Sequence, residues 1–159
     1  MFPVLLRIPE WVPLLGGHPI TSFGFMMFLA FLVFGSLLQR ELRRMELPEQ
    51  RAWDLLFVAA VGGIVGAKLY YILLNWRLAA ADPSFLLSRG GLVWYGGFLL
   101  ATPLLVLQIR RYGLPLGRVA DAIAAVVPLG YAIGRLGCFL VGDDYGRPTA
   151  SAFGMKFPE

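Results

Sequence analysis

The chain has 159 residues, of which 58% are hydrophobic and 15% are charged, with a mean hydropathy of +0.69 and a formal net charge of +4. A soluble domain carries about 25% charged residues, so this composition excludes an ordinary soluble globular domain. The length favours one domain, and a single cysteine excludes an internal disulfide. The basic residues stand beside apolar runs, which is a sign of membrane topology, so we expect no nucleic acid partner.

Four apolar runs are each long enough to cross a bilayer, which takes about 20 helical residues. The first and third runs contain no charged residue, the second contains Lys68, and the fourth contains Asp121 and Arg135. We expect Asp121 to cap the fourth helix. The predicted spans cover about 20–38, 55–74, 91–109 and 119–141.

These spans predict an all-α integral membrane protein with about four transmembrane helices. We expect a single membrane domain over residues 1–159, with an interfacial leader over 1–19 and an outer tail over 142–159. The leader is too short and too interrupted by proline to span a bilayer. It also has no basic segment before its apolar residues, which argues against a cleaved signal peptide.

Arginines predict the orientation of the chain in the membrane. The first and third connections hold seven basic residues, against five on the opposite side, and positive residues concentrate in cytoplasmic loops. Both termini are then expected outside the cytoplasm. The seven residues are Arg40, Arg43, Arg44, Arg51, Arg110, Arg111 and Arg118.

Two pairs of glycines have the spacing of close helix contacts. Gly62 and Gly66 form one pair, and Gly130 and Gly134 form the other. Small residues four apart let membrane helices approach closely, so we expect tight packing at both pairs.

The predicted topology puts polar residues of three spans at one depth. Lys68 lies 14 residues beyond Asp54, and Arg135 lies 14 residues beyond Asp121, which is about 21 Å along a helix in each case. Tyr95 follows the outer end of the third span closely. We therefore predict one polar layer in the outer third of the bilayer, facing a shared cavity.

Two cations at one depth repel each other unless an anion lies between them. Arginine binds phosphate with a planar fork and lysine binds it as a point charge, so a lipid phosphate is the simplest anion. Two alternatives remain open: each cation pairs with a carboxylate, for example Arg135 with Asp143, or Arg135 only extends to the interface.

Glycines surround Tyr95 on both sides, at Gly90, Gly91, Gly96 and Gly97. Each glycine weakens a helix by about 1 kcal/mol relative to alanine, so the run indicates a bend or the close approach of a ligand. The alternative is that Trp94 and Tyr95 are simply an aromatic pair at the membrane interface.

These features together resemble the prolipoprotein diacylglyceryl transferase family. The family signature is matched by Gly134-Arg135-Leu136-Gly137-Cys138-Phe139, by Gly142-Asp143, and by Gly146-Arg147-Pro148-Thr149. Its glycine-flanked aromatic or histidine position is matched by Tyr95, its basic residue in the second span by Lys68, and the start of its first span by Phe23-Gly24.

The resemblance implies transfer of a diacylglyceryl group from phosphatidylglycerol to the lipobox cysteine thiol of a prolipoprotein. It also implies a multi-pass protein of the bacterial cytoplasmic membrane whose active layer faces outward, with no cofactor and no metal. The implied catalytic residues are Tyr95, Arg135 and Asp143. The implied substrate-binding residues are Lys68, Arg135, Gly96, Gly97, Gly134, Gly137, Gly142, Gly146 and Arg147.

The chain departs from the family at three points. Cys138 replaces an asparagine, Asp143 replaces the commoner glutamate, and the family's later motif and further arginine have no match. We therefore expect an incomplete form of the enzyme with little activity alone. The alternatives are a catalytically silent membrane protein that binds anionic lipid and, ranked last, half of a channel or transporter.

Overall fold

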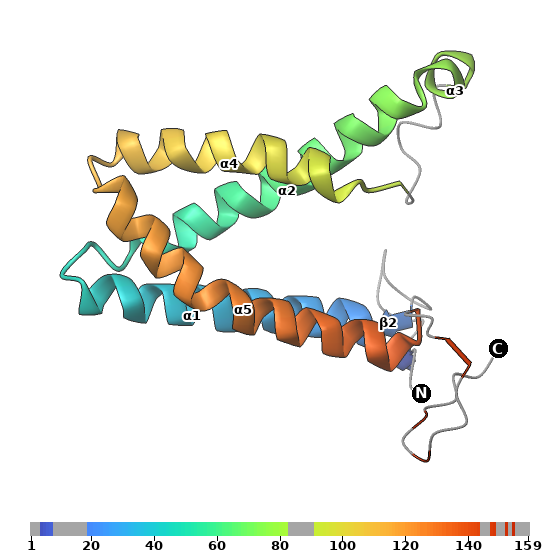
Figure 1. Cartoon of the computed structure of the whole chain (residues 1–159), viewed down its shortest axis with the longest axis horizontal. Coiled ribbons are helices and arrows are strands. Elements are labelled where there is room, and N and C mark those ends of the chain that lie inside the picture. Colours follow the sequence, from blue (N-terminus) through green and yellow to red (C-terminus); the bar gives the residue numbers. More distant parts are fainter. Residues whose placement is uncertain are drawn as a thin grey trace. The chain divides into compact units, whose positions relative to one another are not determined.

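The computed structural model describes residues 4–7, 19–82, 91–143, 147–148, 152 and 154. Most of the described residues are helical, with one small antiparallel sheet (Figure 1). The elements are β1 (Val4–Arg7), β2 (Pro19–Thr21), α1 (Ser22–Arg44), α2 (Arg51–Leu74), α3 (Trp76–Ala81), α4 (Trp94–Arg111) and α5 (Leu116–Val141).

Three of the described helices are long and apolar enough to cross a membrane, namely α1, α2 and α5. Helix α4 has 18 residues and carries Arg110 and Arg111 in its last turn, and it is not among those three. A mainly helical architecture with three to four long apolar helices agrees with the predicted fold class. The division into four spans, a leader and a tail stays a prediction.

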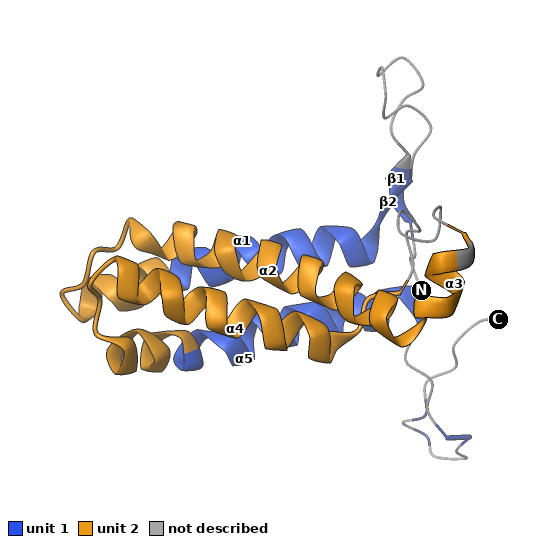
Figure 2. Cartoon of the chain, turned by 90° about the horizontal axis from the view of Figure 1, so that it is seen from above, with its two compact units in different colours: residues 1–37, 124–159 blue, residues 38–123 orange. Residues whose placement is uncertain are grey.

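The chain separates into two compact units, coloured in Figure 2. We call residues 38–123 the central unit, and residues 1–37 with 124–159 the terminal unit. The central unit holds the end of α1, all of α2, α3 and α4, and the start of α5. The terminal unit holds the sheet, most of α1 and most of α5.

The best-packed part of the central unit is the end formed by the turns at 45–50 and 112–115, which we call the loop end. Its buried side chains come from four helices and are nearly or fully inaccessible. They belong to Leu38, Leu42, Ala52, Leu55, Ile109, Val119 and Ala122. Burial of these side chains removes their apolar surface from water and stabilises the contact among the four helix ends.

A polar contact joins α2 to the turn after α4 at the loop end. The Tyr112 hydroxyl donates a hydrogen bond to an Asp54 carboxylate oxygen over 2.9 Å. Arg51 pairs with the same oxygen over 3.1 Å and lies 4.1 Å above the centre of the Tyr112 ring. These three residues fix the register of α2 against the end of α4.

The opposite part of the central unit is held by close backbone contact between α2 and α4, which cross there in opposite directions (Figure 1). We call it the glycine end, comprising residues 62–71 and 91–97. A Cβ atom built at Gly66 would lie less than 3.0 Å from the Gly96 carbonyl oxygen, and one at Gly62 would lie 3.1 Å from the Cα of Ala101. The prediction of close packing at Gly62 and Gly66 is confirmed.

In the terminal unit, α1 packs against α5 in the opposite direction. A Cβ atom built at Gly137 would lie 3.0 Å from the Cβ of Met26, which is a tight contact. The same atom at Gly130 or Gly134 would have ordinary contacts of 3.4 and 3.8 Å. The prediction of tight packing at the pair Gly130 and Gly134 is therefore wrong, because the nearest neighbours there are flexible side chains and not backbone.

A two-stranded antiparallel sheet that the sequence did not predict precedes α1. Strand β1 pairs with β2 antiparallel, with Leu6 opposite Ile20 and an irregularity between Val4 and Leu6. The Thr21 hydroxyl oxygen accepts a hydrogen bond from the Gly24 amide over 3.1 Å, so Thr21 caps the first turn of α1.

Helix α5 begins three residues before the predicted span, at Leu116. Pro115 precedes this start, and its carbonyl oxygen accepts the Val119 amide over 3.1 Å. Asp121 consequently lies in the second turn of the helix and not at its cap, so its expected capping role is wrong.

Candidate functional site

The first candidate residue in the central unit is Lys68, which is half-buried on α2. Its ammonium nitrogen lies 5.5 Å from the centre of the Tyr71 ring, within the range of a cation–π interaction. The two residues are three apart on the helix, so their side chains are neighbours on one face. Tyr71 therefore restricts where the Lys68 charge can lie.

An extended segment before α4 packs against the same turn of α2. The Val93 amide donates a hydrogen bond to the Ala67 carbonyl oxygen over 3.2 Å. Gly91 has a φ of +75°, and a Cβ atom there would overlap the Tyr71 ring. The ring of Tyr71 therefore contacts the backbone at Gly91 as well as the Lys68 ammonium group.

Tyr95 lies in the first turn of α4, directly after this segment, and 66% of it is exposed. Its ring meets the Trp94 ring edge to face, with centroids 5.3 Å apart, and Trp94 stacks on Phe98 at 5.4 Å. The hydrogen bond between Val93 and Ala67 thus brings Tyr95 to the same end of the central unit as Lys68.

Gly96 and Gly97 have a packing role in the structure. A Cβ atom at Gly97 would lie 2.8 Å from the Gly63 carbonyl oxygen, and one at Gly96 would overlap Tyr70 and the Gly66 carbonyl oxygen. Contact with α2 thus accounts for both glycines without a ligand. Their role in substrate binding stays a prediction.

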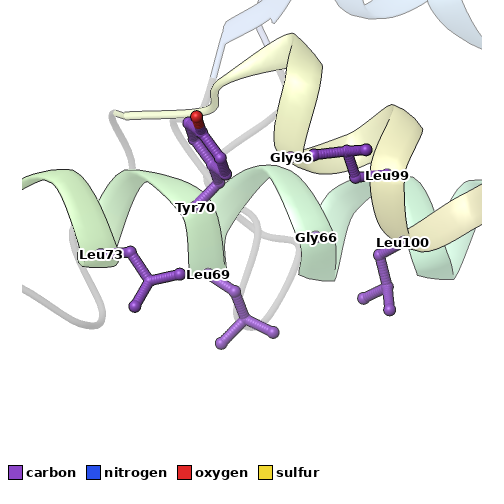
Figure 3. A pocket seen from close by; sticks show the side chains of 7 residues that line it. All are labelled: Gly66, Leu69, Tyr70, Leu73, Gly96, Leu99 and Leu100. Atoms are coloured by element: carbon purple, nitrogen blue, oxygen red, sulfur yellow. The ribbon is translucent and has the colours of Figure 1, made fainter.

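A shallow groove of about 230 Å³ runs beside this crossing (Figure 3). It is lined by residues of α2 and α4 that are apolar apart from one tyrosine: Gly66, Leu69, Tyr70, Leu73, Gly96, Leu99 and Leu100. Lys68 is two residues from Gly66 and two residues from Tyr70, and two residues turn a helix by about 200°. Lys68 therefore lies on the side of α2 away from the groove. The groove therefore suits an apolar chain, and its lining contains no cationic side chain for a phosphate.

Arg135 belongs to the terminal unit and is exposed on α5. Gly130, Gly134 and Gly137 face α1, whereas Arg135 is turned by about 100° from Gly134 and lies away from that contact. A charged side chain on a membrane helix usually marks a functional position. Arg135 therefore lies outside the face of α5 that carries these glycines.

The residues after Arg135 in the signature close the helix. Gly142 has a φ of +80°, and its amide donates a hydrogen bond to the Cys138 carbonyl oxygen over 2.8 Å. Glycine is favoured in this conformation at a helix end. Asp143 and Arg147 are exposed, and Gly146 lies outside the described residues.

The predicted site residues thus fall into two groups. The central unit brings Lys68 and Tyr95 to one end, and the terminal unit holds Arg135 and Asp143 near the end of α5. A shared cavity between the groups stays a prediction.

The sequence analysis missed Tyr71, although its spacing of three residues from Lys68 is a signal that could have found it. In the described part of the chain, no three histidine, cysteine, aspartate or glutamate residues cluster as metal ligands.

Comparison with known proteins gives one family and many relatives. The family model for prolipoprotein diacylglyceryl transferase matches residues 9–159. A phosphatidylglycerol–prolipoprotein diacylglyceryl transferase from Leptospira interrogans is 33% identical over 81% of this chain and 48% of its own length. Relatives with the same name from Synechococcus elongatus and Bordetella avium are 32% and 30% identical, covering 91% and 98% of this chain.

The chain spans about half the length of the curated relatives it matches, 50% of the Synechococcus protein and 62% of the Bordetella protein.

Proposed function

Because the chain belongs to the prolipoprotein diacylglyceryl transferase family, we propose that it carries the phosphate-binding part of such a transferase. The reaction takes the diacylglyceryl group of phosphatidylglycerol to the lipobox cysteine thiol of a prolipoprotein. The observation that carries this proposal is the hydrogen bond between Val93 and Ala67, which joins the approach to Tyr95 with the turn that bears Lys68.

The reaction needs a nucleophile and a leaving group. The cysteine thiol loses its proton, its sulfur forms a bond to the glycerol carbon, and the bond from that carbon to the phosphate oxygen breaks. The electron pair leaves on the oxygen of glycerol phosphate, and the lipid becomes a thioether. A cysteine thiol has a pKa near 8.5, so removal of its proton assists the reaction.

Cationic groups assist this reaction where negative charge develops. In the proposal, Lys68 and Arg135 bind the phosphate and stabilise charge on the departing oxygen, which is commonly the largest catalytic contribution. The contact with Tyr71 supports the role of Lys68, because it fixes the ammonium group beside an aromatic ring. Tyr95 binds the head group or assists removal of the thiol proton, and Asp143 orients Arg135 or acts as the base.

The glycines of the signature let the lipid phosphate approach the backbone of α5. Gly134 supports this role, since a Cβ atom there would have only an ordinary contact of 3.8 Å with Met27, so packing alone does not require glycine. We propose that Gly142, Gly146 and Arg147 complete the binding surface. Gly137 is buried against Met26 of α1, and its role in substrate binding stays a prediction. In the proposal, the polar layer lies in the outer third of the bacterial cytoplasmic membrane, where phosphatidylglycerol and the lipobox peptide meet.

The test uses the purified chain in vesicles that contain phosphatidylglycerol, with a synthetic lipobox peptide. Lipid binding is measured by native mass spectrometry and thioether formation by mass spectrometry of the peptide. We expect Lys68→Gln and Arg135→Gln each to weaken phosphatidylglycerol binding by about tenfold, since hydrogen bonds to charged groups contribute about 1.5–3 kcal/mol. Arg135→Lys should weaken it as well, because lysine lacks the planar fork.

The matched control is Arg77→Gln, which removes an exposed arginine at the start of α3. Unchanged binding in both Lys68→Gln and Arg135→Gln would contradict the proposed site. Binding without any thioether would support the alternative, a silent protein that binds anionic lipid.

A further inference from the structure

The seven arginines at the loop end of the central unit differ in their partners. Three of them form ion pairs, two of which are 2.9 and 3.1 Å long. These are Arg43 with Glu49, Arg44 with Glu41, and Arg51 with Asp54. Because each of these charges is offset by a neighbouring carboxylate, the three pairs stabilise the turn and add little positive potential.

The other arginines have no carboxylate partner in the described part of the chain. Arg118 donates to the Met45 carbonyl oxygen, whereas Arg40, Arg110 and Arg111 are exposed and lie in no ion pair there. Two carboxylates at this end, Glu46 and Asp121, are exposed and outside the three pairs as well. The loop end thus has seven arginines and five carboxylates.

Arg40, Arg110 and Arg111 all belong to the loop end of the central unit. The contact of Arg118 with Met45 joins the start of α5 to the turn after α1, and the contact of Tyr112 with Asp54 joins the turn after α4 to α2. Arg40 near the end of α1 and Arg110 in the last turn of α4 therefore lie at the same end of the central unit.

These arginines stand at the boundary between apolar and polar sequence. The uncharged run of the first span ends at Gln39, directly before Arg40, and that of the third ends at Ile109, directly before Arg110. The hydrocarbon of a bilayer ends at such boundaries, and lipid phosphates follow. Clusters of basic residues at this level attract anionic lipids.

We propose that Arg40, Arg110 and Arg111 form a binding surface for the phosphates of anionic phospholipids, which we call the arginine surface. A guanidinium group matches two phosphate oxygens with its planar fork. This surface lies at the end of α2 opposite to Lys68, which is 14 residues and about 21 Å from Asp54. It is therefore independent of the proposed transfer reaction.

A helix dipole also favours cations in the last turn of α4. That explanation applies to Arg110 and Arg111 and requires only their charge. It does not extend to Arg40, which precedes the end of α1 by four residues. The two explanations differ in whether a lipid phosphate is bound and in whether lysine can replace arginine.

The test places the full chain in nanodiscs of phosphatidylcholine with phosphatidylserine, and native mass spectrometry counts the phosphatidylserine molecules that stay bound. The variant changes Arg40, Arg110 and Arg111 to glutamine together, and Arg111→Gln alone is a milder version. We expect phosphatidylserine binding to weaken by about fivefold for each arginine removed. Lysine at all three positions should give binding between that of the natural chain and the glutamine variant.

The control is Arg77→Gln, an exposed arginine in the same unit but at the other end of α2, which should bind phosphatidylserine like the natural chain. Circular dichroism checks that each variant keeps its helices. Unchanged binding in both glutamine variants would overturn the proposal, as would an equal loss in Arg77→Gln. Lysine variants that bind as well as the natural chain would overturn the role of the planar fork.

The result is separable from the proposed transfer. The double variant Lys68→Gln with Arg135→Gln should keep phosphatidylserine binding at the arginine surface while its phosphatidylglycerol binding weakens. If the double variant lost all phosphatidylserine binding, the arginine surface would be contradicted even if the transferase proposal held.

Discussion

The two ends of the central unit are held together in different ways. At the loop end, side chains from four helices interlock, and Leu42, Leu55 and Val119 are between 0% and 1% exposed. At the glycine end, α2 and α4 touch through backbone atoms at Gly66 and Gly96. The loop end is a packed core of side chains, and the glycine end is a close contact of two helix backbones at glycine residues.

This difference separates the scaffold from the candidate site. A packed core uses its side chains for contact with each other and leaves few of them for a ligand. A contact between backbones forms without interlocking side chains. Lys68, Tyr71 and Tyr95 all lie at the glycine end, where backbone contact between α2 and α4 holds the helices together.

The largest effect should come from opening the packed core. We expect Leu55→Ala to lower the free energy of unfolding by about 2–5 kcal/mol, because the substitution leaves a cavity that the surrounding side chains fill only in part. Unfolding of the purified chain in mixed micelles measures this. Leu73→Ala is the control, since Leu73 is 69% exposed on the same helix, and an equal loss in both variants would show that the loop end is no core.

The next effect should come from the glycine end. Gly66→Ala places a methyl group against the Gly96 carbonyl oxygen, and overpacking of this kind costs about 1–3 kcal/mol. The matched control is Gly63→Ala, because a Cβ atom at Gly63 has nothing within 4 Å, and alanine there favours the helix by up to about 1 kcal/mol. Thermal unfolding in detergent compares them. If Gly66→Ala were as stable as Gly63→Ala, close backbone contact would not hold this end.

A smaller effect tests the polar contact at the loop end. Tyr112→Phe removes the hydrogen bond to Asp54 but keeps the ring under Arg51, so we expect a loss of about 1 kcal/mol. The control is Tyr131→Phe, at a tyrosine that is 67% exposed on α5. The same unfolding assay applies, and a larger loss in the control than in Tyr112→Phe would contradict a stabilising role for the contact.

The smallest effect on stability is expected in the terminal unit, where it distinguishes packing from binding. Gly134→Ala should leave stability nearly unchanged, because the added atom has only an ordinary contact with Met27, yet it should weaken phosphatidylglycerol binding if the lipid approaches this backbone. Gly137→Ala is tighter against Met26, at 3.0 Å, and should lower the melting temperature slightly. If Gly134→Ala bound lipid normally, the glycine would have no role in the proposed site.

Several features of the chain were predictable from local sequence. The apolar runs predict membrane helices, because an uninterrupted apolar stretch of about 20 residues fits the hydrocarbon thickness of a bilayer whichever helices it packs against. The close contact of Gly62 and Gly66 with another helix was also predictable, because small residues four apart let two membrane helices approach closely. The signature around Arg135 predicted the family, because it is a run of neighbouring residues.

Other features depend on which face of a helix meets its neighbour. The glycine that packs tightly in α5 is Gly137 and not the predicted pair, because the crossing with α1 places Met26 opposite it. Asp121 could not be placed correctly because the helix begins earlier, at Leu116.

By itself, the sequence determined the membrane helices, the cations within them and the family, because each depends on the identity or spacing of nearby residues. Only the tertiary structure decided that the Tyr71 ring contacts Gly91, and that Tyr112 forms a hydrogen bond to Asp54 across 58 positions. The physical reason is that helix rotation and crossing are set by the packing of all side chains together. A pair of residues far apart in the chain carries no local sign that it will meet.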